Sequence, residues 1–91
     1  MNVIKRDGSI QQFNYAKIQD AATKAFKSAG EELTDTFAAQ LQQAVEKFIA
    51  NKDSVDIEEI QDVIQKELIK RNKYNVVEAF ILIERNVNVF V

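Results

Sequence analysis

The stretch VIKRDGSIQQFNYAKI, residues 3–18, decides the fold of the chain. Residues 3–6 and 10–13 are two short β-prone pieces, and Asp7 and Gly8 lie between them. An Asp-Gly pair favours a two-residue type I′ hairpin turn, because both central positions of that turn need a positive φ. We therefore predict a β-hairpin with a two-residue turn. Its predicted cross-strand partners are Arg6 and Ser9, Lys5 and Ile10, and Ile4 and Gln11.

Two helical patterns follow the hairpin. Asn14 is a suitable N-cap for the first helix, and Gly30 is suited to end it in the left-handed conformation. Thr34 or Thr36 can cap a second helix that ends near Asn51. The apolar face of the first helix is Ile18, Ala21, Ala22, Ala25, Phe26 and Ala29. The apolar face of the second is Phe37, Leu41, Ala44, Val45, Phe48 and Ile49.

The second half of the chain predicts a short strand near Val55 and two more helices. Asp56 with Glu59 three residues later is a capping-box pattern for a third helix, and Asn75 with Glu78 repeats it for a fourth. The apolar stripe of the third helix is Ile57, Ile60, Val63, Ile64 and Leu68. Apolar residues surround the fourth helix almost completely, which predicts that it is central in the bundle or lies at an interface. These are Val76, Val77, Ala79, Phe80, Ile81, Leu82 and Ile83.

We predict one domain over residues 1–91, built from a hairpin, four helices and a third strand. Only two glycines and no proline occur in the chain, which favours long regular elements and a mainly helical protein. The apolar C-terminal tail has two interpretations: the chain is part of something longer, or the tail docks on a partner. The tail residues are Val87, Val89, Phe90 and Val91.

The composition excludes several classes of function. The 91 residues are 46% hydrophobic and 29% charged, as in an ordinary soluble globular domain. Cysteine and histidine are both absent. Their absence excludes disulfides, zinc ribbons, cysteine nucleophiles and imidazole bases.

The net charge and the hydropathy pattern limit the kinds of partner that the chain can have. A formal net charge of −2 argues against nucleic-acid binding driven by backbone electrostatics. No apolar run approaches the length of a membrane span, and the N-terminus lacks a signal-peptide pattern. Because Met1 directly precedes a strand, we expect a true N-terminus, a cytoplasmic protein and no contact with a membrane.

Three cations surround the turn and the start of the first helix. Lys5 and Arg6 flank the turn, and Lys17 lies in the first helical turn. One interpretation is a solvated turn, because surface turns are usually charged. The other is an anion site, because the free N–H groups at a helix start attract negative charge and Lys17 is unfavourable there without an anion.

The neighbouring residues extend the anion site to a nucleotide site. Gln11 and Asn14 can supply amide hydrogen bonds, and apolar side chains can form walls for a flat ring. The candidate wall residues are Phe13, Ile18 and Ile57. The two interpretations remain open on these residues alone.

The same stretch resembles the opening of the ATP-cone domain, V-x-K-R-D-G-x-x-x-x-F-[DN]-x-x-K-I. The later segments VDIEEIQDVIQKEL and YNVVEAFILIER resemble the third and fourth helices of that family. The resemblance implies an α+β fold, mainly helical, in which a three-stranded sheet covers a four-helix bundle. It also implies binding of ATP or dATP, with magnesium as counter-ion, in the allosteric activity switch of ribonucleotide reductases.

The resemblance also implies roles for individual residues. The phosphates would be bound by Lys5, Arg6 and Lys17. The pocket under base and sugar would be shaped by Val3, Phe13 and Ile18. Hydrogen bonds to the nucleotide would come from Asn14 and Gln11. The third helix would face the base or sugar with Ile57, Ile60 and Gln61, and the fourth would contribute Arg85. From spacing alone, Ile57 and Ile60 are equally well explained as core residues and Gln61 as a solvated polar residue.

These implications lead us to expect a regulatory domain, the N-terminal activity module of a ribonucleotide reductase. Its expected partners are adenine nucleotides and the rest of the reductase or its other subunits. We also expect ligand-dependent self-association. Reductase chemistry needs cysteines, so the chain itself is not the catalyst. A ligand domain of a reductase-gene repressor is an alternative, but it would need a DNA-binding module ahead of Met1. A helical interaction module that binds no nucleotide is the other alternative.

Overall fold

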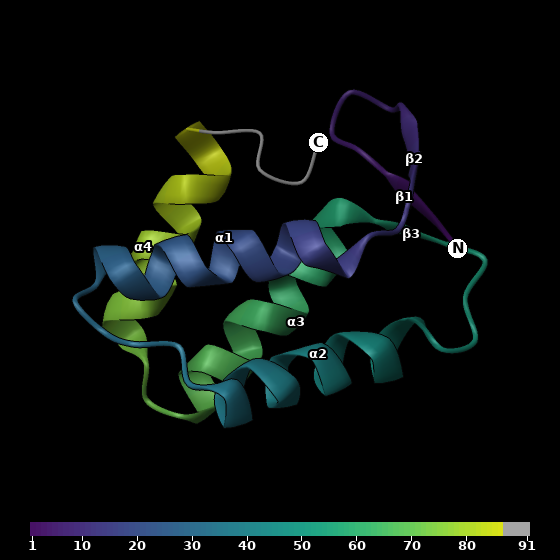
Figure 1. Cartoon of the computed structure of the whole chain (residues 1–91). Helices are drawn as coiled ribbons and strands as arrows, with labels where there is room; N and C mark the ends of the chain where they lie inside the picture. The colour runs from purple at the N-terminus through teal and green to yellow at the C-terminus, as the bar shows by residue number, and fades with distance from the viewer. Residues whose placement is uncertain (87–91) are drawn as a thin grey trace.

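The computed structural model describes the backbone of residues 1–86 and the side chains of residues 1–83. The predicted α+β fold is confirmed: a small sheet lies at one end of four helices (Figure 1). The elements are β1 (Asn2–Ile4), β2 (Ile10–Gln12), α1 (Tyr15–Ser28), α2 (Asp35–Ile49), β3 (Ser54–Asp56), α3 (Ile57–Lys70) and α4 (Tyr74–Asn86). The predicted apolar tail lies outside the described residues, and a single domain over residues 1–91 stays a prediction.

The three strands form one mixed sheet in the order β2-β1-β3. β1 pairs antiparallel with β2 and parallel with β3, so that Val3 lies between Gln11 and Val55. Val3 and Val55 are buried against the helices, whereas Ile10 on the other face is 67% exposed. The predicted strand near Val55 is therefore present as β3, and it is the edge strand on the opposite side of β1 from β2.

The predicted turn and its register are wrong by one residue. Ile4 pairs with Ile10, and the Lys5 amide donates to the Ser9 carbonyl at 2.8 Å. The loop therefore has three residues, Arg6 to Gly8, of which only Gly8 has a positive φ, at 85°. A type I′ turn would need positive φ at the Asp position as well.

The Asp7 side chain explains why the longer loop forms. Its carboxylate accepts hydrogen bonds from the Ser9 hydroxyl at 2.6 Å and from the Ser9 amide at 2.9 Å. These two bonds lower the pKa of Asp7 and fix the backbone between the two residues. The sequence prediction considered only the Asp-Gly pair and omitted this serine.

The first two helices begin and end where the capping residues predict. Asn14 accepts a hydrogen bond from the Ala16 amide at 3.0 Å at the start of α1. At its end Gly30 has a φ of 74°, and the Glu31 amide donates to the Phe26 carbonyl at 2.9 Å. Of the two threonine candidates, it is Thr34 that caps α2.

The third helix also starts as predicted, but the fourth does not. Asp56 caps α3, and its amide donates to the Glu59 carboxylate at 3.4 Å. Asn72, with a φ of 61°, ends α3, and the Lys73 carbonyl accepts the first helical bond of α4 from Val77 at 3.0 Å. Asn75 therefore lies inside the first turn of α4 and is not its N-cap. The prediction was wrong because the left-handed Asn72 allows the next helix to begin almost at once.

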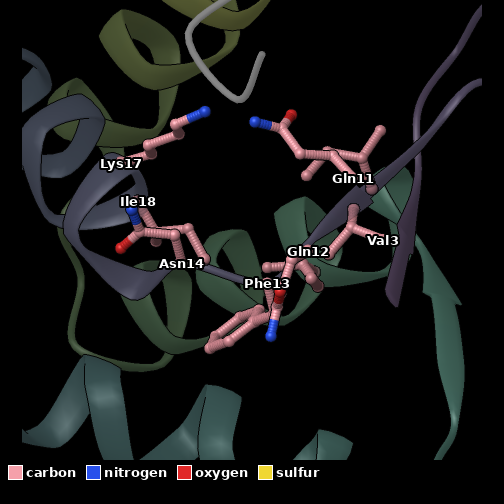
Figure 2. Close-up of a pocket in the computed structure, with 9 residues that line it drawn as sticks. Val3, Gln11, Gln12, Phe13, Asn14, Lys17 and Ile18 are labelled. Carbon is pink, nitrogen blue, oxygen red and sulfur yellow. The ribbon is translucent and has the colours of Figure 1, made fainter. Parts of the chain in front are cut away.

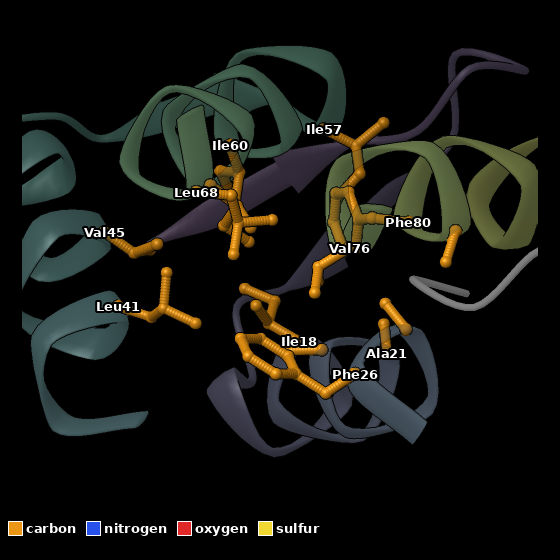
Figure 3. Close-up of a cluster of buried hydrophobic side chains, with 14 of the residues drawn as sticks. Ile18, Ala21, Phe26, Leu41, Val45, Ile57, Ile60, Leu68, Val76 and Phe80 are labelled. Atoms are coloured by element: carbon orange, nitrogen blue, oxygen red, sulfur yellow. The ribbon is translucent and has the colours of Figure 1, made fainter. Parts of the chain in front are cut away.

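The core lies between the helices and under the inner face of the sheet (Figure 3). α1 packs mainly against α4, and α3 packs against both α2 and α4. Val76 and Phe80 of α4 are fully buried, whereas Leu82 is 58% exposed. α4 is therefore amphipathic in its described part. The alternative that it is central in the bundle does not hold at Leu82, and the alternative that it lies at an interface stays a prediction. None of the described helices is long and apolar enough to cross a membrane.

Tyr15 carries a polar group that the core does not satisfy. Its hydroxyl is buried and has no hydrogen-bond partner within the described part of the chain. Burial, together with the nearby Glu46 carboxylate, raises the pKa of Tyr15 to about 12. Because this pKa is raised above the ordinary value of 10.0, the unfolded chain ionises first. Stability is therefore present below pH 10 and is lost as the pH rises towards 12.

We predict that Tyr15→Phe raises the free energy of unfolding at pH 7 by about 1 kcal/mol, because it removes an unsatisfied buried hydroxyl. The variant should also lose less stability than the parent between pH 10 and 12. Denaturant unfolding at both pH values measures the two effects. Tyr74→Phe is the control that should gain no stability, because that side chain is 59% exposed and its hydroxyl already donates to the Asn72 side chain at 3.1 Å. A Tyr15→Phe variant less stable than the parent at pH 7 would show that the hydroxyl has a partner.

Candidate functional site

A hollow lies between the end of β2, the start of α1 and the start of α3. Its free space is about 280 Å³, including the open mouth. Only about 20 Å³ of it is enclosed enough to count as cavity, far below the roughly 300–1,000 Å³ typical of ligand pockets, so the hollow is shallow in this structure. The hollow is lined by Val3, Gln11, Gln12, Phe13, Asn14, Lys17, Ile18, Ile57 and Ile60. All of these except Gln12 are residues that the sequence predicted for the site.

Polar groups gather on one side of this hollow. Lys17 from α1 and Gln11 from β2 reach towards one another across the opening (Figure 2). The Asn14 carbonyl oxygen is already used to cap α1, so this side chain can offer a ligand only its N–H groups. The arrangement combines a cation, two amides and apolar walls.

The Gln11 side chain is incompletely satisfied. Its carbonyl oxygen Oε1 is buried and has no hydrogen-bond partner within the described part of the chain. Buried carbonyl oxygens in folded proteins nearly always accept a hydrogen bond. Gln11, which lines the hollow, therefore carries an acceptor that no described group satisfies.

The start of α1 differs electrostatically from the start of α3. α1 has no acidic residue in its first turn, and Lys17 lies there instead. α3 has Glu58 and Glu59 in its first turn. A helix N-terminus favours negative charge, so α3 supplies its own anions while α1 does not.

The other two predicted cations line a second, adjoining hollow. Its free space is about 400 Å³, again including open solvent. The lining residues are Ile4, Lys5, Arg6, Asp56, Ile57 and Glu58. Ile57 borders both hollows, so the two are neighbours across the start of α3. In this structure Lys17 lies at one hollow and Lys5 with Arg6 at the other, so the three cations do not meet at one point.

Arg6 is held by α3. Its Nη2 donates to the Gln61 Oε1 at 3.2 Å, and its Nε lies 3.7 Å from the Glu58 carboxylate. Gln61 is only 5% exposed, so the alternative of a solvated polar residue is wrong. Gln61 lines neither of these two hollows, and it contacts Arg6 instead.

Several residues of these hollows were not predicted from the sequence. Gln12 borders the first hollow although strand alternation places it on the opposite face from Gln11. Asp56 and Glu58 border the second; Asp56 was predicted only as a helix cap, and Glu58 was given no role. Asp56 and Glu58 directly flank Ile57 in the sequence, and Ile57 was predicted for the site, so this adjacency could have indicated both as site residues. Arg85 lies in the last turn of α4, and its side chain is outside the described residues.

The sequence profile of the ATP cone domain matches residues 1–87, which is nearly the whole chain. The chain belongs to the ATP-cone family. The chain is also similar to the ribonucleoside-diphosphate reductase subunit alpha of Chlamydia pneumoniae, with 32% identity over 89 residues. The match covers 88% of this chain and 8% of that protein, so this ATP-cone domain spans a small part of the relative's length. The chain is thus a nucleotide-binding regulatory domain and not a catalytic one.

We predict that Arg6→Met lowers the free energy of unfolding of the ATP-cone domain by about 1–2 kcal/mol. The reason is that the buried Gln61 would lose its donor, and a buried acceptor without a partner is costly. Lys5→Met is the matched control: Lys5 is a half-buried cation next to Arg6 that is not bonded to Gln61, so the change should alter stability by less than about 0.5 kcal/mol. Denaturant unfolding without ligand measures both. Equal stability of the two variants would show that the Arg6 contact contributes nothing.

Proposed function

We propose that this ATP-cone domain binds ATP and dATP as allosteric effectors, and that it is the N-terminal activity switch of a ribonucleotide reductase. The observation that carries the proposal is the first hollow, where the Lys17 ammonium and the Gln11 amide reach towards one another above apolar walls. An adenine nucleotide has an amino group that can donate to the amide oxygen, a flat base for the walls and phosphates for the cations.

The proposed binding mode uses the predicted residues in three groups. Base and sugar would lie in the first hollow, which Val3, Phe13, Ile18, Ile57 and Ile60 line. The polar contacts there would come from Gln11, Asn14 and Lys17. The phosphates would extend past Ile57 towards Lys5 and Arg6 in the second hollow. Because the first hollow is small, a nucleotide that spans both hollows fits better than one confined to the first.

Magnesium enters the proposal as the counter-ion of the phosphates. Among the described residues, no group of three or more His, Cys, Asp or Glu side chains is arranged to hold a metal ion. The nucleotide's own phosphates would therefore supply the ligands, since magnesium is usually bound by phosphates and few carboxylates. A contact from Arg85 remains part of the proposal.

The reductase part of the proposal is supported by the name of the Chlamydia pneumoniae relative. The rest of such a reductase, its other subunits and a cytoplasmic setting follow from that assignment. Ligand-dependent self-association would use exposed apolar side chains such as Leu82 and Ile69, which are 58% and 47% exposed. A reductase-gene repressor would bind the same nucleotides, so the tests below separate both from a module that binds none.

We predict that ATP with magnesium stabilises the domain against heat. A ligand that binds only the folded state, at a hundredfold excess over its Kd, adds about 2.7 kcal/mol to the free energy of unfolding. For a domain of this size the melting temperature should rise by about 10 °C or more. Differential scanning fluorimetry measures this rise.

Inorganic triphosphate at the same concentration is the control for this melting experiment. It matches the phosphates but lacks the base, so it should raise the melting temperature much less. Equal melting with ATP, with triphosphate and without ligand would contradict nucleotide binding and favour the interaction module.

A second prediction concerns the cation at the start of α1. Lys17→Ala should weaken ATP binding by about 1.5–3 kcal/mol, the usual contribution of a hydrogen bond to a charged group. Lys24→Ala is the control, because Lys24 lies in the same helix, is exposed and lines neither hollow. Isothermal titration calorimetry with ATP measures both variants. If Lys17→Ala binds ATP as tightly as Lys24→Ala does, the role given to Lys17 is wrong.

A further inference from the structure

Arg6 is a cation whose partners in this structure are groups of the protein. Its guanidinium donates to the Gln61 side chain at 3.2 Å and lies 3.7 Å from the Glu58 carboxylate. Both partners belong to α3, which begins at the second hollow. A phosphate that binds Arg6 must therefore share it with these groups or replace one of them.

The two partners differ in how easily they can be replaced. Gln61 is 5% exposed, and its oxygen would become a buried acceptor without a donor if Arg6 moved away. The Glu58 side chain is 71% exposed and that of Arg6 is 47% exposed. Exposed ion pairs contribute little, because water solvates both charges once they separate. Glu58 is therefore the partner that a ligand can displace.

We infer that Glu58 competes with the phosphates of the ligand for Arg6, and that Gln61 is a positioning residue that holds Arg6 in place. The inference rests on the proposed function. An arginine has five N–H donors, so Arg6 can keep its bond to Gln61 while a phosphate takes the place of the Glu58 carboxylate.

This competition selects a class of ligand. The ligand must bring more negative charge to Arg6 than the single carboxylate that it displaces. A nucleotide with a polyphosphate chain meets this condition, whereas a nucleoside without phosphates does not reach Arg6. Glu58 is thus a residue that sets the preference for polyphosphates at this site, and Gln61 acts on the ligand only through Arg6.

The test compares Glu58→Gln with Asp62→Asn by calorimetric titration with ATP and with adenosine. Asp62 lies on the same helix, loses the same charge and pairs with Lys66 at 2.9 Å instead of Arg6. Glu58→Gln should bind ATP about three- to tenfold more tightly than the parent. Loss of a surface ion pair of up to about 1 kcal/mol corresponds to a change of about fivefold in Kd. The variant also removes the repulsion between the Glu58 carboxylate and the phosphates, which adds to this gain. Asp62→Asn should stay within about twofold, and adenosine should bind all three proteins equally.

The role of Gln61 is tested with Gln61→Met, which keeps the size of the side chain and removes the acceptor. This change should weaken ATP binding about fivefold in the parent and have no further effect in an Arg6→Met background. The affinity of Gln61→Met for adenosine should equal that of the parent. If Gln61→Met weakens adenosine as much as ATP, Gln61 contacts the nucleotide directly and the positioning role is overturned.

Failure of the inference and failure of the proposed function give different results. If the parent binds no ATP, the proposed function is wrong and the inference falls with it. If the parent binds ATP and Glu58→Gln binds it no more tightly than Asp62→Asn, only the inference is overturned. Glu58 is exposed, so its substitution tests the competition even if Gln61→Met does not fold.

Discussion

The parallel pairing of β1 with β3 is the contact on which the other features depend. It places Val3 beside Val55, and both side chains are buried under the sheet. A two-stranded hairpin alone is at best marginally stable in water, so the third strand and the helices beneath it are needed to hold the hairpin. The same pairing brings the start of α3 next to the turn between β1 and β2. Both hollows lie along this junction, and Ile57, the first residue of α3, borders each of them.

Much of the fold could be predicted because its helix boundaries depend on local chemistry. Asn14 and Gly30 act within one turn of their own positions, so the sequence alone was enough to place them, whereas it left Thr34 and Thr36 open as caps of α2. Asn75 shows the limit of such signals. A capping pattern also occurs inside helices, and here a left-handed Asn72 had already ended α3 and allowed α4 to start earlier. The sequence contained both asparagines, and only the backbone conformation decides which one ends an element.

The candidate site was predictable to a similar extent and for the same reason. Most residues of the first hollow come from residues 3–18, where the spacing along one strand and one helix start determines which side chains are close. The contact between Arg6 and Gln61 joins residues far apart in sequence and depends on the turn. In the predicted register Arg6 would end the ladder opposite Ser9. In the structure it belongs to the three-residue loop, and its side chain reaches α3. A shift of one residue in the hairpin therefore decides whether this contact can form.

The charges around the two helix starts explain why a ligand would bind across both. At α3 the acidic residues of the first turn stabilise the helix, and one of them, Glu58, also pairs with Arg6 of the hairpin loop. At α1 the first turn holds no acidic residue, and Lys17 adds to the positive end of the helix. In the proposed binding mode, an anion that bridges the two sites would fill a deficit of negative charge at α1 and replace an exposed carboxylate at α3.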